Sequence, residues 1–263
     1  MKKINLIDIG AIGGSQLPWS RHLDKVGTTL SFEPNEDPVL VGKNLKYNCA
    51  VWNFDGVSQF HVYGERGTGS SLLTQNFESV KENFELIKNQ GNEMLNSTWF
   101  DRSTEIKSFQ CPVKKLDTIL SELNRERSSQ IKYHFLKSDT QSGEFFVLDG
   151  ARQYLESDCL GLDLELFRYP LYSGMVLEDD VKEFLYGLGF KIAGWTGYQN
   201  SFLSQADYLF LRAQPRSGEE EKIINLIKEI YAPKGNEKII KYSYHPSLIE
   251  RGIGKIKRIL LST

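Results

Sequence analysis

Regular alternation of short apolar runs with helical segments constrains the fold of this chain more than any other feature. In the second half, strands are expected at 133–138, 160–167, 190–195 and 208–212, and helices at 144–155 and 177–187. Strands separated by helices of ten or more residues form parallel βαβ units, because the helix returns the chain to the end of the sheet where the previous strand began. The last two strands have no helix between them, so we expect them to pair antiparallel.

The first half has a similar but shorter pattern. Strands are expected at 4–9, 29–32 and 49–52, helices at 17–26 and 36–46, and a hairpin that begins at Asp55-Gly56 and continues through 57–63. A helix is also expected at 116–126. The sequence therefore predicts an α/β fold, a Rossmann-like doubly wound sheet with helices on both faces.

Domain boundaries follow from breaks in this pattern. At 263 residues the chain suits one large domain or two small ones, and we place the main domain at 1–213. Residues 64–110 form an insertion, for which a lid over a site and a plain surface excursion are equally open interpretations. Residues 214–263 form a helical basic extension, which starts with a capping-box pattern at Ser217 and Glu220. Its basic tail could contact an anionic membrane surface or partner, although packing on its own domain is favoured.

Composition excludes several classes of protein. The formal net charge of −2 lacks the positive field that binding to nucleic acid needs, so we expect no nucleic-acid partner. Three cysteines at wide spacings, Cys49, Cys111 and Cys159, favour reduced thiols over a disulfide framework. No transmembrane segment or signal-peptide core is found in the sequence. We therefore expect a cytoplasmic location, and the sequence sets no oligomeric state.

Residues that follow the first two strands indicate a nucleoside site. Gly10 and Gly13 allow a tight turn close to a ligand, but Ile12 and Ser15 occupy positions where a dinucleotide fingerprint needs glycine. A P-loop motif is absent from the sequence. Glu33, at the end of the second strand, can accept two hydrogen bonds from a ribose diol. This pattern favours a nucleoside without a diphosphate, and an ordinary strand-to-helix turn is the alternative.

Charged residues also mark the strand at 133–138. Lys137 and Asp139 share one face of this strand, and Asp139 emerges at its carboxyl end, where it could approach a cationic ligand or orient an acceptor. Because a lysine within a strand is unusual, we expect Lys137 to pair with Glu144 or Glu165. The alternative is that this pair only stabilises the sheet and has no role in function.

The joint order of these motifs resembles the FkbM family of S-adenosylmethionine-dependent methyltransferases. The resemblance covers about residues 4–195, and each motif is weak when taken alone. It rests on Asp8-Ile-Gly-Ala, Phe32-Glu-Pro34, Asn44, Asn48, Ala50-Val-Trp-Asn-Phe-Asp-Gly56, Gly69-Ser-Ser71, Lys115-Leu-Asp117, Phe135-Leu-Lys-Ser-Asp-Thr-Gln141, Leu148-Asp-Gly-Ala151, Leu164-Glu-Leu-Phe167, Pro170-Leu-Tyr172 and Gly189-Phe190. The sequence departs from the family pattern at Ile12, His134 and Ser142-Gly143.

The resemblance implies a seven-stranded methyltransferase sheet that binds S-adenosylmethionine and releases S-adenosylhomocysteine. It places the methionine part of the cofactor at Asp8, Gly10 and Ala11, the ribose at Glu33, and the methyl group near Asp139. The adenine would lie at Asn53 or at the neighbouring Val51 and Trp52, and Gly13 and Pro34 complete the expected cofactor site. Family members methylate oxygen atoms, often hydroxyls of sugars or natural products, so we expect a glycan or small-molecule acceptor.

The general base is not identified by the sequence. The candidates are Asp139, Glu165, His22 and His134, in that order, because the first two lie near carboxyl ends of strands, whereas His134 begins a strand and should lie far from the site. Asp139 and Glu165 together could hold a divalent cation, but no further clustered ligand supports it and no metal is expected. Aromatic surface for a sugar ring could come from Tyr169, Tyr172 and Trp195, with core packing as the alternative.

Two hypotheses of different classes follow from the sequence. The first is an S-adenosylmethionine-dependent methyltransferase that acts on a sugar hydroxyl or a related small-molecule hydroxyl. The second is a catalytically inactive scaffold or partner-binding module with the same fold. A nicotinamide oxidoreductase ranks below both because of Ile12 and Ser15.

Overall fold

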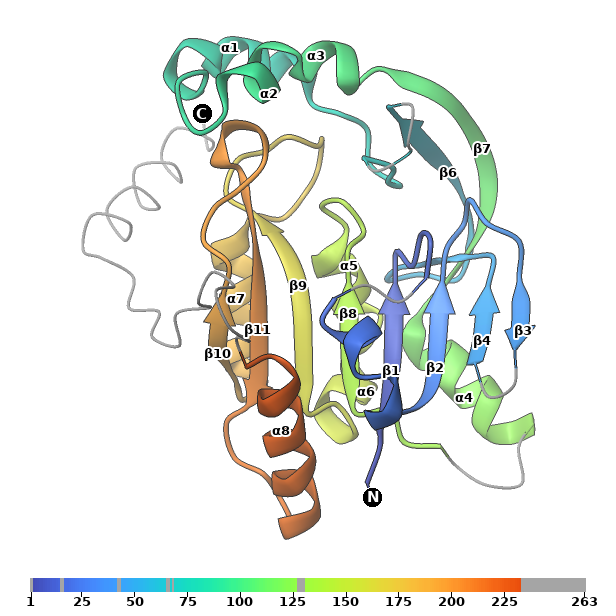
Figure 1. Cartoon of the computed structure of the whole chain (residues 1–263). Coiled ribbons are helices and arrows are strands. Elements are labelled where there is room, and N and C mark those ends of the chain that lie inside the picture. The colour runs from blue at the N-terminus through green and yellow to red at the C-terminus, as the bar shows by residue number, and fades with distance from the viewer. Residues whose placement is uncertain are drawn as a thin grey trace.

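The fold is built on one eight-stranded sheet in a computed structural model that describes residues 2–14, 17–41, 44–64, 67, 69–126 and 131–232 (Figure 1). The order of strands across the sheet is β10-β11-β9-β8-β1-β2-β4-β3. Their bounds are β1 Ile4–Ile9, β2 Val26–Phe32, β3 Val39–Val41, β4 Asn44–Tyr47, β8 Phe135–Ser138, β9 Gly161–Phe167, β10 Phe190–Trp195 and β11 Gln205–Arg212.

The strand order confirms the predicted seven-stranded α/β sheet. Across the sheet, neighbouring strands pair parallel in the order β4, β2, β1, β8 and β9. Strand β11 runs antiparallel between β9 and β10. Setting β11 aside, the remaining order is that of the doubly wound Rossmann sheet, 3-2-1-4-5-6. The third strand is not the one expected: β4 takes its place, and the strand expected at 49–52 forms only Ala50–Val51 in a separate sheet. The short strand β3 is an eighth, antiparallel strand at the edge of the main sheet, which the sequence did not predict.

Helices cover both faces of the sheet, as predicted. The first face packs on α4 (Leu116–Glu126), α5 (Glu144–Asp149), α6 (Arg152–Ser157) and α7 (Glu178–Gly187) around Ile7, Leu136 and Leu164. The second face packs on α8 (Gly218–Ile230) around Leu6 and Phe135. Alternation of side chains along β1 and β8 separates the two cores.

Two expected helices in the first half are wrong. The segment expected as a helix at 17–26 contains 3-10 turns at Trp19–Arg21 and Leu23–Lys25, and it then enters β2. The segment at 36–46 forms β3 and β4. In this region the Asn48 side chain donates to the carbonyl oxygens of Pro34 and Glu36. Such local bonds between side chain and backbone compete with a helix.

The expected hairpin at 57–63 is also wrong. Strand β6 (Gly56–Tyr63) pairs antiparallel with β7 (Glu105–Lys114), a partner far along the chain, and β5 (Ala50–Val51) pairs parallel with β7. The turn at Asp55-Gly56 therefore joins two edges of a separate three-stranded sheet. Between β6 and β7 the chain forms α1 (Phe77–Ile87), α2 (Glu93–Ser97) and α3 (Trp99–Arg102), which lie above the carboxyl ends of the main strands (Figure 1).

The C-terminal helix α8 begins where the capping pattern predicts. The Ser217 hydroxyl oxygen accepts from the backbone N–H of Glu220 at 3.2 Å. The Glu220 carboxylate instead accepts from the Arg216 N–H, one residue earlier than a full capping box requires. The predicted basic tail lies outside the described residues. Within them, no helix has the length and apolar content to cross a membrane.

Candidate functional site

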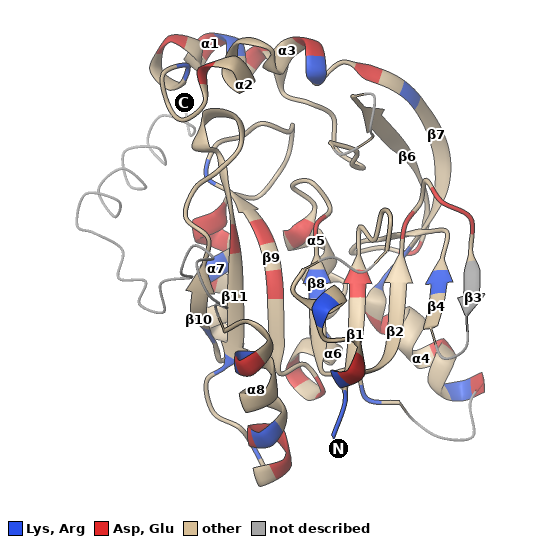
Figure 2. Ribbon diagram, in the orientation of Figure 1, with Lys and Arg blue, Asp and Glu red and all other residues tan. Residues whose placement is uncertain are grey.

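The carboxyl ends of β1, β2 and β8 meet at Gly10. Its N–H donates to the Phe32 carbonyl oxygen, and the Asp139 N–H donates to the Ile9 carbonyl oxygen, each at 3.0 Å. Gly10 has φ of +79°, and a Cβ atom there would lie 2.0 Å from the Asp139 carbonyl oxygen. Only glycine can take this conformation and this close approach at once. Charged residues on the strands lie close to this edge, with acidic residues on β1 and β9 beside a basic residue on β8 (Figure 2).

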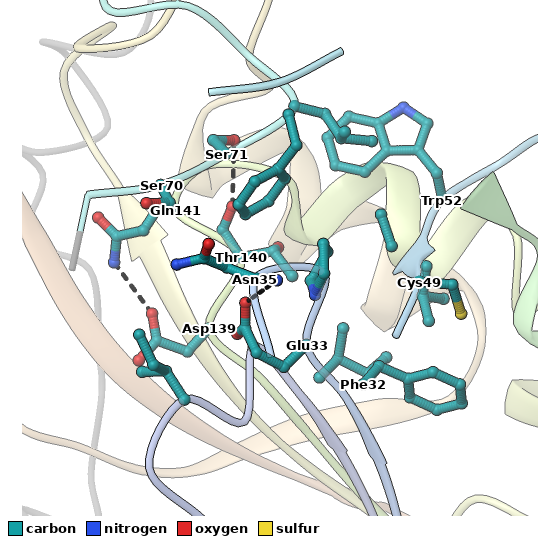
Figure 3. A pocket seen from close by; sticks show the side chains of 18 of the residues that line it. Phe32, Glu33, Asn35, Cys49, Trp52, Ser70, Ser71, Asp139, Thr140 and Gln141 are labelled. Atoms are coloured by element: carbon teal, nitrogen blue, oxygen red, sulfur yellow. Dashed lines mark hydrogen bonds between the residues drawn. The ribbon is translucent and has the colours of Figure 1, made fainter. Parts of the chain in front are cut away.

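An apolar cavity of about 130 Å³ opens beside this junction (Figure 3). Phe32 and Trp52 lie on its wall, and the Trp52 indole stacks on Phe146 with ring centroids 4.6 Å apart. Space for the indole depends on Gly143, because a Cβ atom there would lie 2.3 Å from Trp52 Cζ3. Glycine at position 143 therefore has a physical reason in this chain.

Glu33 places a carboxyl group in this cavity. Its side chain is buried, and Oε1 accepts from the Asn35 N–H at 2.9 Å. Burial raises the pKa of Glu33 above its ordinary value. A buried carboxyl group on an otherwise apolar wall provides the acceptor that a diol needs.

A second cavity of about 790 Å³ adjoins the first, and Asp139 and Gln141 line both. Its upper wall comes from α2 and α3, through Leu95 and Arg102, and its floor includes Glu165. Ligand pockets commonly measure about 300–1,000 Å³, so the small cavity alone fits part of a ligand and the larger one fits a whole small molecule.

Asp139, which lines both cavities, lies beside Glu165, which lines the larger one. Gln141 Nε2 donates to Asp139 Oδ1 at 2.9 Å and to Glu165 Oε2 at 2.6 Å, and Gln205 donates to the other Glu165 oxygen. Burial raises the pKa of Glu165 well above its ordinary value, and the neighbouring Asp139 raises it further. The Asp139 side chain is 31% exposed, so it is the more accessible of the two acids.

The loop that carries Gln141 adopts an uncommon conformation. Gln141 and Ser142 have φ values of 51° and 76°, in the left-handed region that non-glycine residues rarely enter. The hydroxyl group of Tyr172 donates to the Gly69 carbonyl oxygen at 2.9 Å and lies 3.3 Å from Gln141 Oε1. Such backbone strain persists where the surrounding structure fixes it, and it is concentrated at functional sites.

The helices of the insertion are tied to the connection between β10 and β11. Asn96 Oδ1 accepts from the Phe202 N–H at 2.6 Å, and the Arg102 guanidinium donates to Ser201 Oγ at 2.9 Å. Asn200 and Phe202 in this connection also have positive φ. Residues of α2 and α3 thus lie over the larger cavity, and the structure does not test whether the insertion moves as a lid.

The structure brings only some of the predicted site residues to the cavities. Those that line them are Gly10, Glu33, Pro34, Trp52, Asp139 and Glu165. Those that line neither described cavity are Asp8, Ala11, Gly13, His22 and Asn53.

Each of these five residues has other surroundings. Asp8 is buried beside Lys137, and the Asn53 amide donates to Asp149 at 3.0 Å. The Gly13 N–H donates to Glu36, and the Ala11 carbonyl oxygen accepts from Lys46. His22 is buried between the two 3-10 turns. The roles expected for these residues at the cofactor or as base stay predictions.

The partners expected for Lys137 are also wrong. Its Nζ lies 3.8 Å from Asp8 Oδ1 and 3.8 Å from Asp139 Oδ2. Glu144 instead accepts from the N–H and hydroxyl of Thr140, at 2.7 and 3.0 Å. Burial raises the pKa of Glu144 to about 8.

The remaining candidates separate clearly. His134 lies at the amino end of β8, where Nδ1 accepts from the Asn5 N–H, so its predicted distance from the site is confirmed. Of the three aromatic candidates, Tyr172 lines the larger cavity. Tyr169 donates to Gln90, and Trp195 stacks on Tyr208. Across the described ranges, no cluster of three His, Cys, Asp or Glu side chains is arranged to hold a metal ion.

Sequence reasoning missed two amides that line the larger cavity. Gln141 follows Asp139 by two residues, and its place after the strand was a usable signal. Gln205 begins the antiparallel strand β11, and its approach to Glu165 depends on a pairing that no local pattern specifies.

Comparisons with known proteins add little to this geometry. No family model matches the sequence, and no curated protein matches it. Among solved structures, the chain is similar to the crystal structure of methyltransferase FkbM from Methylobacillus flagellatus KT, at 13% identity and a TM-score of 0.43. The match covers 79% of this chain and 43% of that one, so the chain spans less than half the length of its structural neighbour. A match this distant does not assign a family, and the fold follows from the strand order itself.

Proposed function

We propose that this protein is an S-adenosylmethionine-dependent methyltransferase that methylates a hydroxyl oxygen of a sugar, a glycan or a related small molecule. One observation carries the proposal: an apolar cavity with the Glu33 carboxyl group meets a larger cavity of mixed polar and apolar lining at Asp139. Both open at the carboxyl edge of a Rossmann-order sheet, which is the ligand-binding edge of such folds.

The residues of the small cavity fit the nucleoside part of the cofactor. Glu33 would accept hydrogen bonds from the ribose diol, and Phe32 and Trp52 would contact the base. Gly10 leaves room for the ligand to approach the backbone, and Asp139 provides a carboxyl group toward a sulfonium charge.

The cofactor, when bound, supplies an electrophilic methyl group. The chain's own task is to orient the acceptor oxygen in line with it and to remove the hydroxyl proton. Asp139 is our first candidate for the proton acceptor because it is exposed at the shared wall. Gln141, which bridges Asp139 and Glu165, would fix the direction of that carboxylate.

Three free, buried cysteines support the further proposal of a reducing, cytoplasmic location. The acceptor would enter the larger cavity, whose amide, carboxyl and aromatic groups suit a polyhydroxylated ring.

Transfer of labelled methyl groups tests this proposal. The purified protein and labelled S-adenosylmethionine would be incubated with a panel of neutral glycosides and with a cell extract. We expect label in a sugar fraction, and at least a hundredfold loss with Asp139→Asn. Cofactor binding without transfer to any acceptor would favour the inactive scaffold, which is the alternative function.

A further inference from the structure

On the sheet face that packs against α8, Lys137 lies among several acids. Figure 2 shows the basic residue of β8 between acidic residues on β1 and β9. Lys137 on β8 is in register with Asp8 on β1 and with Asp163 on β9. We call this group the acid cluster; its members are Asp8, Asp139, Asp163, Glu165 and Asp207.

The geometry around Lys137 is unusual for a buried cation. Its side chain is 9% exposed, and that of Asp8 is 3% exposed. Lys137 Nζ is 3.8 Å from both Asp8 and Asp139, and neither Nζ nor Asp8 Oδ1 has a hydrogen-bond partner among the described residues. The ammonium group thus lies midway between two carboxylates and balances both, without a direct hydrogen bond to either.

The far side of the cluster is closed by α8 and the first 3-10 turn. The Tyr231 hydroxyl, just after α8, donates to Asp163 Oδ2 at 2.7 Å and accepts from Trp19 Nε1 at 3.0 Å. Asp163 is thereby fixed, while Asp139 keeps one face toward the cavities. Of the acids nearest Lys137, Asp139 is the one that lines both cavities.

We propose that Lys137 is a positioning residue: its ammonium group holds the Asp139 carboxylate at the wall between the two cavities and compensates the charge of the acid cluster. The use that Asp139 makes of this position rests on the proposed function. The electrostatic arrangement itself does not depend on it.

Removing the ammonium group leaves carboxylates that cannot all ionise in a poorly solvated space. The groups that face it are Asp8 from β1, Asp139 just after β8, Asp163 and Glu165 from β9, Asp207 from β11 and Tyr231 just after α8. Lys46 on β4 also acts electrostatically on Asp8 and lowers its pKa. Without Lys137, the folded protein therefore retains an additional proton at neutral pH.

Urea unfolding across pH 6 to 8 tests the arrangement without any ligand. A proton retained only by the folded state lowers the folding equilibrium constant tenfold for each pH unit. Between pH 6 and 8, we expect the folding equilibrium constant of Lys137→Met to fall at least tenfold more than that of wild type. The constant of Lys137→Arg should change with pH as that of wild type does. Asp8→Asn, which removes an acid from the same cluster, should make the profile flatter than wild type and provides a second test if Lys137→Met does not fold. Profiles parallel to wild type for the folded variants would overturn the proposal.

Binding of two nucleosides tests the positioning of Asp139. S-adenosylmethionine is a cation at sulfur and S-adenosylhomocysteine is neutral there, so their affinity ratio reports the charge at the wall. In Lys137→Met at pH 6.5, we expect the affinity for S-adenosylmethionine, divided by that for S-adenosylhomocysteine, to be at least fivefold lower than in wild type. By pH 8.5 this ratio should return to the wild-type value. Lys182→Met is the matched control, because Lys182 is equally buried but pairs with Glu178 away from the cavities.

The outcomes separate the two proposals. Wild type that binds neither nucleoside refutes the proposed function, and the unfolding profiles still decide the role of Lys137. Wild type that binds both, with an unchanged and pH-independent ratio in Lys137→Met, overturns the positioning role alone.

Discussion

Replacing Gly10 by alanine tests the geometry on which the site depends. Gly10 and Gly13 have similar positive φ values, +79° and +71°, so alanine meets the same backbone penalty at both positions. That penalty is about 1–2 kcal/mol. The two positions differ in space: the added Cβ would lie 2.0 Å from the Asp139 carbonyl oxygen at Gly10, and nothing lies within 4 Å at Gly13.

The additional cost at Gly10 is set by how far the strand ends can separate. Hydrogen bonds from the Gly10 N–H to Phe32 and from the Asp139 N–H to Ile9 hold them together. Overpacking a fixed contact costs about 1–3 kcal/mol, and this overlap is with backbone, which cannot rotate away. We therefore expect Gly10→Ala to be less stable than Gly13→Ala by about 2–3 kcal/mol in equilibrium urea unfolding.

The same pair of variants should differ in ligand binding. Gly10→Ala moves Asp139 away from the wall of both cavities, whereas Gly13→Ala leaves that wall in place. Equal free energies of unfolding for the two variants would refute the proposed close approach of β1 and β8.

Three further changes have defined outcomes. Glu144→Gln keeps an acceptor oxygen for Thr140 and removes a carboxyl group whose pKa burial raises from 4.5 to about 8. The stability that this group contributes below pH 4.5, and that is lost as pH rises through 8, should vanish from the pH profile, a difference of roughly 5 kcal/mol at pH 9 in thermal or urea unfolding. Gly143→Ala places a Cβ 2.3 Å from Trp52 and should weaken S-adenosylhomocysteine binding at least tenfold in calorimetry. Asn96→Leu leaves the buried Phe202 N–H unsatisfied and should cost about 1–3 kcal/mol, with faster proteolysis between α1 and β7.

For each of these three predictions, one result would contradict the reasoning. Glu144→Gln and wild type with parallel profiles from pH 5 to 9 would mean that Glu144 is not a buried acid. Gly187→Ala is the control for the cavity variant, since a Cβ there meets nothing within 4 Å; equal binding by both glycine variants would contradict the role of Trp52. Asn83→Ala, on the exposed side of α1, controls for the amide, and equal proteolysis of the two would contradict the attachment at Asn96.

The second half of the fold was predictable because its signals are local. Apolar runs and ten-residue helical segments placed β8, β9, β10 and α7 within a few residues of their bounds. One error there has a physical cause: the helix expected at 144–155 is divided into α5 and α6 around Gly150, where a Cβ would lie 1.9 Å from the Trp52 carbonyl oxygen.

The first half was harder because its contacts are distant in sequence. Nothing near β6 specifies β7 as its partner. Glu36 and Asn48 hold a strand connection through side-chain bonds, where a helix was expected. The residues of the site also differ in how local their signals are. Glu33 and Asp139 follow strands and were found from the sequence, whereas Gln205 reaches Glu165 only through antiparallel pairing.

Calorimetric titration with S-adenosylhomocysteine tests the central claim most directly, namely that the cavity at Glu33 holds the nucleoside of the methyl donor. We predict one binding site in wild type, affinity at least tenfold weaker in Glu33→Gln, and no change in Glu85→Gln on the exposed side of α1, whose carboxylate pairs only with surface Lys88 among described ion pairs. Absence of binding in wild type, or equal affinity in wild type and Glu33→Gln, would contradict it.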